Sequence, residues 1–165
     1  MKRSEFLDLV TRFSERPIPA TINRHIYLWL GEMDDLLVKS PGGFFKKLDL
    51  HVLCQNISKT PYGDKAAGRE LTNTVDVWLS NNFAPAHNQR ALLVNGLDLI
   101  YRYRLPISTF MRLANENCMI VLLLSALDVN FRIGKPLPDY IQFAPDAILK
   151  YVGTEISQEA IIGEE

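Results

Sequence analysis

The sequence is poor in the residues that build disulfide frameworks and metal sites. Its 165 residues include two cysteines and three histidines, and neither a CxxC pair nor an HExxH helix is present. Cys54 and Cys118 each lie in an apolar run, where a buried free thiol in a reducing cytoplasm is the ordinary state. These absences exclude a disulfide scaffold and lead us to expect no metal centre.

An excess of one charge and a long apolar run are also missing. The net charge is −1, so the chain has no global basic field of the kind that coats nucleic acid, although a local basic patch stays open. The apolar run 119–124 is far too short to span a membrane. Charges within the apolar pattern of the first 13 residues exclude a signal peptide. We therefore expect a cytoplasmic protein with no membrane partner.

Arrangements typical of a catalytic site are absent as well. The sequence has no GxSxG elbow, and no Ser/His/Asp, Cys/His or paired-carboxylate pattern stands out. We therefore assign no catalytic residue.

Two apolar runs dominate what the sequence does contain. Residues 91–94 and 119–124 each end at a small polar residue, Asn95 or Ser125, and a stretch with helical spacing lies between them. This pattern predicts neighbouring buried parallel strands, which present polar side chains at their carboxyl ends. Ligands bind at that edge of a parallel sheet.

Strand-like and helix-like patterns alternate along the rest of the chain. The expected class is one three-layer α/β/α domain with a mostly parallel sheet of four or five strands, plus an N-terminal amphipathic helix. We place the helix and a Pro-rich hinge at 1–20, the domain at 21–152 and a tail at 153–165. Strands are expected at 25–30, 50–54, 91–94, 119–124 and 140–143, and helices at 4–15, 34–38, 65–79, 97–101, 108–116 and 146–152.

The N-terminal helix is a candidate interface. Pro17 and Pro19 separate it from the domain, because neither continues a helix. We expect its apolar stripe to dock on a partner protein or on a second copy of the chain. The stripe comprises Phe6, Leu9, Val10 and Phe13.

The segment after the first expected strand has only parts of a phosphate-binding loop. Such a loop reads GxxxxGK[ST], with glycines that let backbone N–H groups surround phosphate. Gly31 is in place, but seven residues separate it from Lys39-Ser40 and the second glycine is absent. Three carboxylates between them would repel phosphate. A later echo at Gly63 and Lys65 lacks the hydroxyl residue.

The run 91–95 is similar to a Walker B strand, which ends at an Asp that orients magnesium. Asn95 occupies the Asp position here, and a neutral amide is a poorer ligand for a hard cation. The nearest carboxylate is Asp98. Asn95-Gly96 is equally well explained as a turn that closes a buried strand. Both interpretations stay open.

The segment YRYR at 101–104 forms a local basic cluster. Interleaved Arg and Tyr side chains bind phosphate backbones and stack on bases. Arg102, Arg104 and Arg112 are therefore candidate contacts for nucleic acid or an acidic partner, with Arg132 and Lys135 in support. The alternative is a solvated helix end whose Arg stems cover apolar surface.

The order of these elements resembles the small P-loop proteins (the BrxF family) of BREX-type bacterial phage-exclusion systems, which implies a P-loop/RecA-like fold. Four features over residues 22–145 match: Gly31 after a strand, "VLCQN" before a helix, the stretch 91–127 as Walker B strand, helix and next strand, and "LPDYIQF". The phosphate-loop Lys and hydroxyl have no counterpart at the right spacing, and Asn95 replaces the Walker B acid. The resemblance thus implies a degenerate member without nucleotide hydrolysis, which serves larger nuclease, methyltransferase or ATPase partners.

Three functions follow from these observations. The first is a non-catalytic P-loop-like adaptor of a phage-defence or DNA-processing assembly, with no cofactor and with a homo-oligomer left open. The second is an NTPase with a non-standard loop, which binds ATP and Mg²⁺ through Lys39 or Lys65 and Asp98. The third is a nucleic-acid-binding module. Candidate nucleotide contacts are Gly31, Lys39, Ser40, Asn95 and Asp98.

Overall fold

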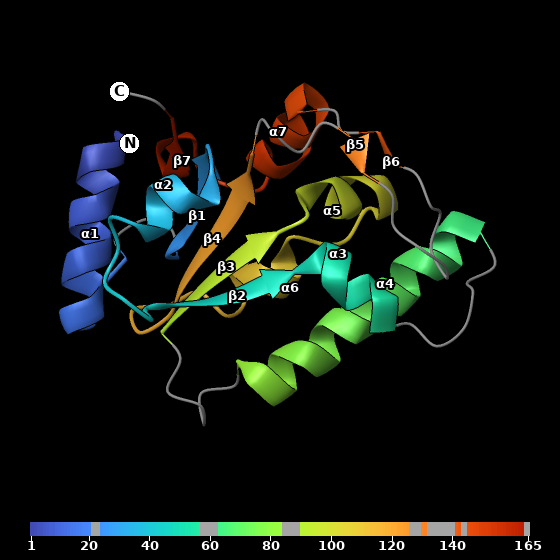
Figure 1. Cartoon of the computed structure of the whole chain (residues 1–165), viewed down its shortest axis with the longest axis horizontal. Helices are drawn as coiled ribbons and strands as arrows, with labels where there is room; N and C mark the ends of the chain where they lie inside the picture. The colour runs from blue at the N-terminus through green and yellow to red at the C-terminus, as the bar shows by residue number, and fades with distance from the viewer. Residues whose placement is uncertain are drawn as a thin grey trace.

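The computed structural model describes residues 1–20, 24–56, 63–83, 90–125, 130–131, 141–142 and 145–163. Its centre is a sheet of five parallel strands with helices around it (Figure 1). The strand order across the sheet is β2-β3-β4-β1-β7. The predicted single α/β domain with a parallel sheet is confirmed. The strands are β1 (Ile26–Leu30), β2 (Phe45–Asp49), β3 (Ala91–Asn95), β4 (Met119–Leu124) and β7 (Ile161–Ile162).

The inner strands of the sheet are covered on both faces. β4 is buried at all six positions, and β1 and β3 are buried at four positions each. Strands covered on both faces read as continuous apolar runs. For that reason the three inner strands stand out in the sequence at nearly their observed bounds.

The edge strand β2 lies where the sequence analysis places no element. Lys46 and Lys47 occupy its middle, a pattern that an edge strand tolerates. The expected strand at 50–54 is wrong, because α3 (Leu50–Leu53) and the 3₁₀ turn η1 (Cys54–Asn56) occupy it. Asp49 begins α3: its Oδ1 accepts from the backbone N–H groups of His51 and Val52, at 2.9 and 3.4 Å.

The fifth strand of the sheet comes from the C-terminal region. β7 pairs with β1, with Leu28 opposite Ile161 and Trp29 opposite Ile162. The sequence analysis instead treats 153–165 as a tail and expects a strand at 140–143. There β6 (Ile141–Gln142) pairs antiparallel with β5 (Asn130–Phe131), in a separate small sheet.

Helix α1 (Arg3–Glu15) matches the predicted N-terminal helix, but its apolar stripe is not exposed. Phe6 and Phe13 have no accessible surface, and the Phe6 ring centroid lies 5.0 Å from that of Tyr27 in β1. Leu9 and Val10 are buried in the same core. The expectation that these four side chains form a free docking face is therefore wrong: they hold α1 on this chain's own sheet.

The other helices lie close to their predicted positions. α6 is shorter than expected, because a turn in which Asn115 and Cys118 exchange backbone hydrogen bonds follows it. No helix among the described residues is long and apolar enough to cross a membrane. The helices are α2 (Met33–Leu37), α4 (Gly63–Asn82), α5 (Leu97–Tyr103), α6 (Ser108–Met111) and α7 (Pro145–Gly153), with a 3₁₀ turn η3 (Gln158–Ala160) before β7.

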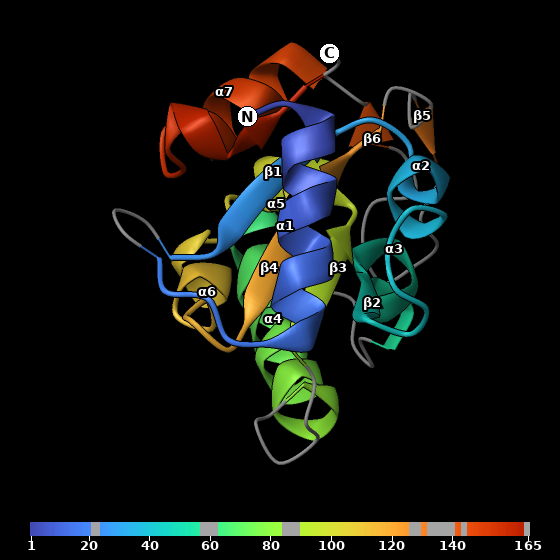
Figure 2. The ribbon, with the colours of Figure 1, turned by 90° about the vertical axis from the view of Figure 1, so that its left-hand side faces the viewer.

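The two faces of the sheet carry different helices. α1 lies on one face and α4 on the other (Figure 2). After β1 the chain moves to the far edge of the sheet at β2, whereas after β4 it moves the opposite way, to β7. The carboxyl ends of the neighbouring strands β1 and β4 are therefore the topological switch point, the position where open α/β sheets bind ligands.

Candidate functional site

Two contacts join the carboxyl ends of β1 and β4 at the switch point. The backbone N–H of Gly31 donates to the carbonyl of Leu124, at 3.0 Å. The Ser125 hydroxyl donates to Oε1 of Glu32, at 2.5 Å. The polar residue predicted at the end of β4 is thus bound to a carboxylate of the loop after β1.

Arg3 of α1 covers the glycine expected to open a phosphate loop. Its Nη2 donates to the carbonyl of Leu30 at 2.5 Å, and its guanidinium carbon lies 4.8 Å from the centroid of the Trp29 ring. A Cβ built on Gly31 would collide with that same Nη2. A side chain at position 31 would therefore have to push the flexible end of Arg3 aside.

The helix after Gly31 is unsuited to an anion. α2 has five residues, with Glu32 as its N-cap and two more carboxylates, Asp34 and Asp35, in its first turn. These charges already complement the positive end of the helix and repel phosphate. Ser40 donates its hydroxyl to the Leu36 carbonyl at 2.6 Å, and Lys39 is exposed.

Asn95 ends β3, and Gly96 is the N-cap of α5. The Asn95 side-chain oxygen accepts from the Gly96 N–H at 2.9 Å, and Gly96 has a φ of +96°. A Cβ on Gly96 would lie 2.8 Å from the Leu50 Cβ and 3.3 Å from Cδ2 of His51. Gly96 is therefore required twice, by its left-handed backbone and by the approach of α3.

Asp98 is a buried carboxylate with a defined partner. It is 2% exposed, and its Oδ1 lies 2.8 Å from Nε2 of His51. Nδ1 of His51 lies 4.0 Å from Oδ1 of Asp49. The other carboxylate oxygen of Asp98, Oδ2, is buried without a hydrogen bond among the described residues. The geometry pairs Asp98 with α3, and no hydrogen bond or ion pair described in the structure joins it to Gly31, Lys39, Ser40 or Asn95.

His51 is a residue that the sequence analysis missed. No metal-binding or catalytic spacing marks it, and the surrounding segment reads as a strand. The Asp-x-His order, with the Asp as N-cap of a short helix, is the signal that would have placed it. Among the described residues, no group of three His, Cys, Asp or Glu side chains is arranged to hold a metal ion.

The cysteines are free thiols, as predicted, and are poor nucleophiles. Burial raises the pKa of Cys54 to about 11, with the negative charges of Asp49 and Asp98 as further causes. Burial likewise raises the pKa of Cys118 to about 11. Both side chains are therefore protonated at neutral pH.

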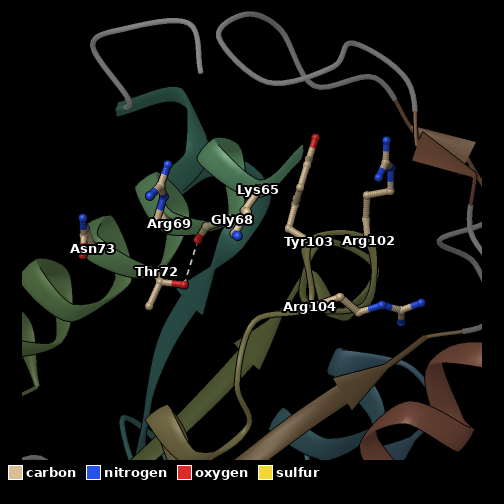
Figure 3. Close-up of a pocket in the computed structure, with 8 residues that line it drawn as sticks. All are labelled: Lys65, Gly68, Arg69, Thr72, Asn73, Arg102, Tyr103 and Arg104. Atoms are coloured by element: carbon tan, nitrogen blue, oxygen red, sulfur yellow. Dashed lines mark hydrogen bonds between the residues drawn. The ribbon is translucent and has the colours of Figure 1, made fainter. Parts of the chain in front are cut away.

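A second candidate site is a groove between α4 and the end of α5, which we call the basic groove. Its volume is about 690 Å³. Gly68 sets its depth, because a Cβ there would lie 2.8 Å from the Tyr103 carbonyl. The described lining residues, drawn in Figure 3, are Lys65, Gly68, Arg69, Thr72 and Asn73 from α4 and Arg102, Tyr103 and Arg104 from α5 and its C-cap.

The arginines at the end of α5 are held by aromatic rings. The Arg104 guanidinium carbon lies 4.4 Å from the Tyr101 ring centroid and 5.2 Å from that of Tyr151, and that of Arg102 lies 5.3 Å from the Tyr103 centroid. Arg104 has a φ of +53°, the left-handed conformation of a helix C-cap. In the view of Figure 3 its side chain runs away from α4, and Tyr103 stands between Arg102 and the residues of α4.

The three arginines predicted as one patch do not share one site. Arg102 and Arg104 line the basic groove, whereas Arg112 pairs with Asp76 of α4, with 3.6 Å between Nη2 and Oδ1. The supporting residues Arg132 and Lys135 lie outside the described residues. The structure instead places Lys65 and Arg69 with Arg102. The i, i+4 spacing of Lys65 and Arg69 on the helix predicted at 65–79 was the sequence signal that could have placed these two side chains together.

Comparisons with protein-family models, curated proteins and solved structures find no match to this chain.

Proposed function

We propose that this chain is a non-catalytic, P-loop-like accessory protein of the cytoplasm, which serves a bacterial phage-defence or DNA-processing assembly. The observation that carries the proposal is Arg3, whose guanidinium covers Gly31 at the switch point. A parallel sheet with this strand order has a position for a ligand at the carboxyl ends of β1 and β4. The chain fills that place with its own side chains.

The surroundings of the switch point support the same proposal. A phosphate loop needs a row of unengaged backbone N–H groups and a lysine. Here the Gly31 N–H is bound to Leu124, and the next side chains are acidic. A nucleotide would have to displace Arg3 and Ser125 and then face Glu32, Asp34 and Asp35.

The position of Asp98 also argues against a magnesium-dependent reaction. A carboxylate that orients a metal presents its oxygens to the ligand site. Asp98 is 2% exposed and bonded to His51. Opening this pair would strand a charge in the interior, which is costly.

The accessory role implies surfaces that bind larger protein subunits. The apolar stripe of α1 is not such a surface, because it is buried. The basic groove concentrates positive charge, and its ligand is a separate question.

Thermal unfolding with ATP, ADP or GTP and magnesium tests the proposal. A nucleotide at about a hundred times its Kd would add about 2.7 kcal/mol, and the Tm would rise by about 5–10 °C. We expect no rise. A saturable rise that persists in the double variant Lys65→Ala/Arg69→Ala, but is lost in Lys39→Ala, would place a nucleotide at the switch point and overturn the proposal.

A further inference from the structure

The basic groove concentrates positive charge, although the chain as a whole has a net charge of −1. Its described lining includes Lys65, Arg69, Arg102 and Arg104 and contains no carboxylate, although the chain carries 18 basic and 19 acidic residues. Random placement of so balanced a set of charges would mix the two signs. The groove is therefore a local field of one sign, which attracts anions.

The donors on α4 form a row. Lys65, Arg69 and Asn73 follow one another at i, i+4 spacing, so they lie on the same side of the helix, about 6 Å apart along its axis. All three side chains are exposed, and Figure 3 shows Arg69 and Asn73 along one side of the groove. A row of this kind suits a ligand with repeated anionic groups better than a single anion.

The opposite wall is already ordered. The Arg102 guanidinium carbon lies 5.3 Å from the Tyr103 ring centroid. Side chains fixed before binding lose less conformational entropy when a ligand arrives. A guanidinium also matches phosphate oxygens with two parallel hydrogen bonds.

We propose that the basic groove binds the phosphate backbone of single-stranded nucleic acid. A positively charged groove that follows one backbone is the usual solution for such ligands. A guanidinium also binds carboxylates, so an acidic protein segment is the alternative ligand, and competition with a polyglutamate peptide separates the two. The row of donors along α4 favours a ligand with a phosphate at every step of its backbone.

The same geometry limits sequence specificity. Tyr103 is 6% exposed, and Arg104 lies over the ring of Tyr101, so neither ring offers bases a free stacking surface. Binding by the backbone alone is independent of sequence and strongly dependent on salt. This proposal does not rest on the state of the switch point, since the groove lies between α4 and α5.

Fluorescence anisotropy with a labelled thymidine oligonucleotide of about 20 residues tests the proposal. For three or four neutralised phosphates, log K should fall with log salt with a slope of about −2 to −3. Lys65→Ala/Arg69→Ala should make the slope shallower by about 1.4 and weaken binding at least tenfold at about 50 mM salt. The control Arg12→Ala/Arg16→Ala removes the same charge from the exposed end of α1 and should bind as the wild type does.

Four results would overturn the proposal. The first is no binding at low salt, and the second is an equal loss in the α1 control. The third is competition by a polyglutamate peptide as effective as that by the oligonucleotide, which would mean a general acidic-partner surface. Inorganic phosphate and ATP serve as further competitors: a requirement for the chain of phosphates predicts that both compete weakly, and tight displacement by ATP would indicate a small-molecule site instead.

Discussion

At the residue scale, the function of Asp98 is decided by its partner. Its carboxylate is buried beneath α3 and accepts from His51, so the charge contributes to holding α3 and α5 together. Gly96 makes this contact possible, since any side chain there would meet Leu50 and His51. A residue that the sequence offers as a metal ligand is thereby explained as part of the fold.

Removing His51 should cost more than a typical surface change. His51→Ala leaves the Asp98 carboxylate buried without its donor, and we expect a loss of about 2–3 kcal/mol in the free energy of unfolding. Urea denaturation of His51→Ala, Asp98→Ala and the double variant measures the coupling free energy between the two side chains. The double variant should lose clearly less than the sum, and additivity within about 0.5 kcal/mol would contradict the pairing.

The thiols should react slowly in the folded protein. Burial raises the pKa of both cysteines from 9.0 to about 11, which lowers the thiolate fraction about a hundredfold at pH 8. Ellman's reagent should therefore label the native protein at least a hundredfold more slowly than the denatured protein. Comparable rates in the two states would mean that Cys54 and Cys118 are accessible thiolates.

At the scale of elements, α1 shows what an amphipathic pattern does and does not determine. The spacing of its apolar residues predicts the helix and its buried side, but the same stripe suits an intramolecular sheet or a foreign partner equally well. Only the neighbouring surface decides between these, and here Tyr27 and Trp29 of β1 supply it.

Truncating the α1 stripe should therefore destabilise the whole domain. Phe6→Ala removes a fully buried ring, and we expect a loss of about 3–5 kcal/mol in the free energy of unfolding. Asp8→Ala, on the exposed side of the same helix, should change it by less than about 0.5 kcal/mol. Denaturation midpoints check both values. An unchanged midpoint in Phe6→Ala would contradict the packing of α1 on the sheet and would support a free docking helix.

The strands were predictable to the extent that both of their faces are buried. β1, β3 and β4 are continuous apolar runs, whereas β2 carries two lysines and β7 has two residues. Edge strands are recognised by their pairing, which follows from tertiary structure and not from local pattern. Local pattern also misassigns residues 50–54. In isolation this run resembles a strand, whereas in the structure it packs as a short helix capped by Asp49, followed by a 3₁₀ turn.

At the scale of the whole molecule, the switch point of the sheet is covered by side chains of the chain itself, Arg3 from α1 and the bonded pair Ser125 and Glu32. The missing second glycine and the acidic loop after β1 are visible in the sequence, because both features are local. The position of Arg3 over Gly31 is not visible there, since these residues come together only when α1 docks. The basic groove is hidden from local reading for the same reason: α4 contributes Lys65 and Arg69, and α5 contributes Arg102.

Calorimetric titration of the wild-type protein with ATP and magnesium tests the central claim most directly. The account predicts no saturable heat at the switch point, because Arg3 and Ser125 already satisfy its backbone and side-chain groups. A one-to-one isotherm of micromolar affinity would contradict it, provided that Lys65→Ala/Arg69→Ala preserves the binding and Lys39→Ala abolishes it. The switch point would then be a working nucleotide site.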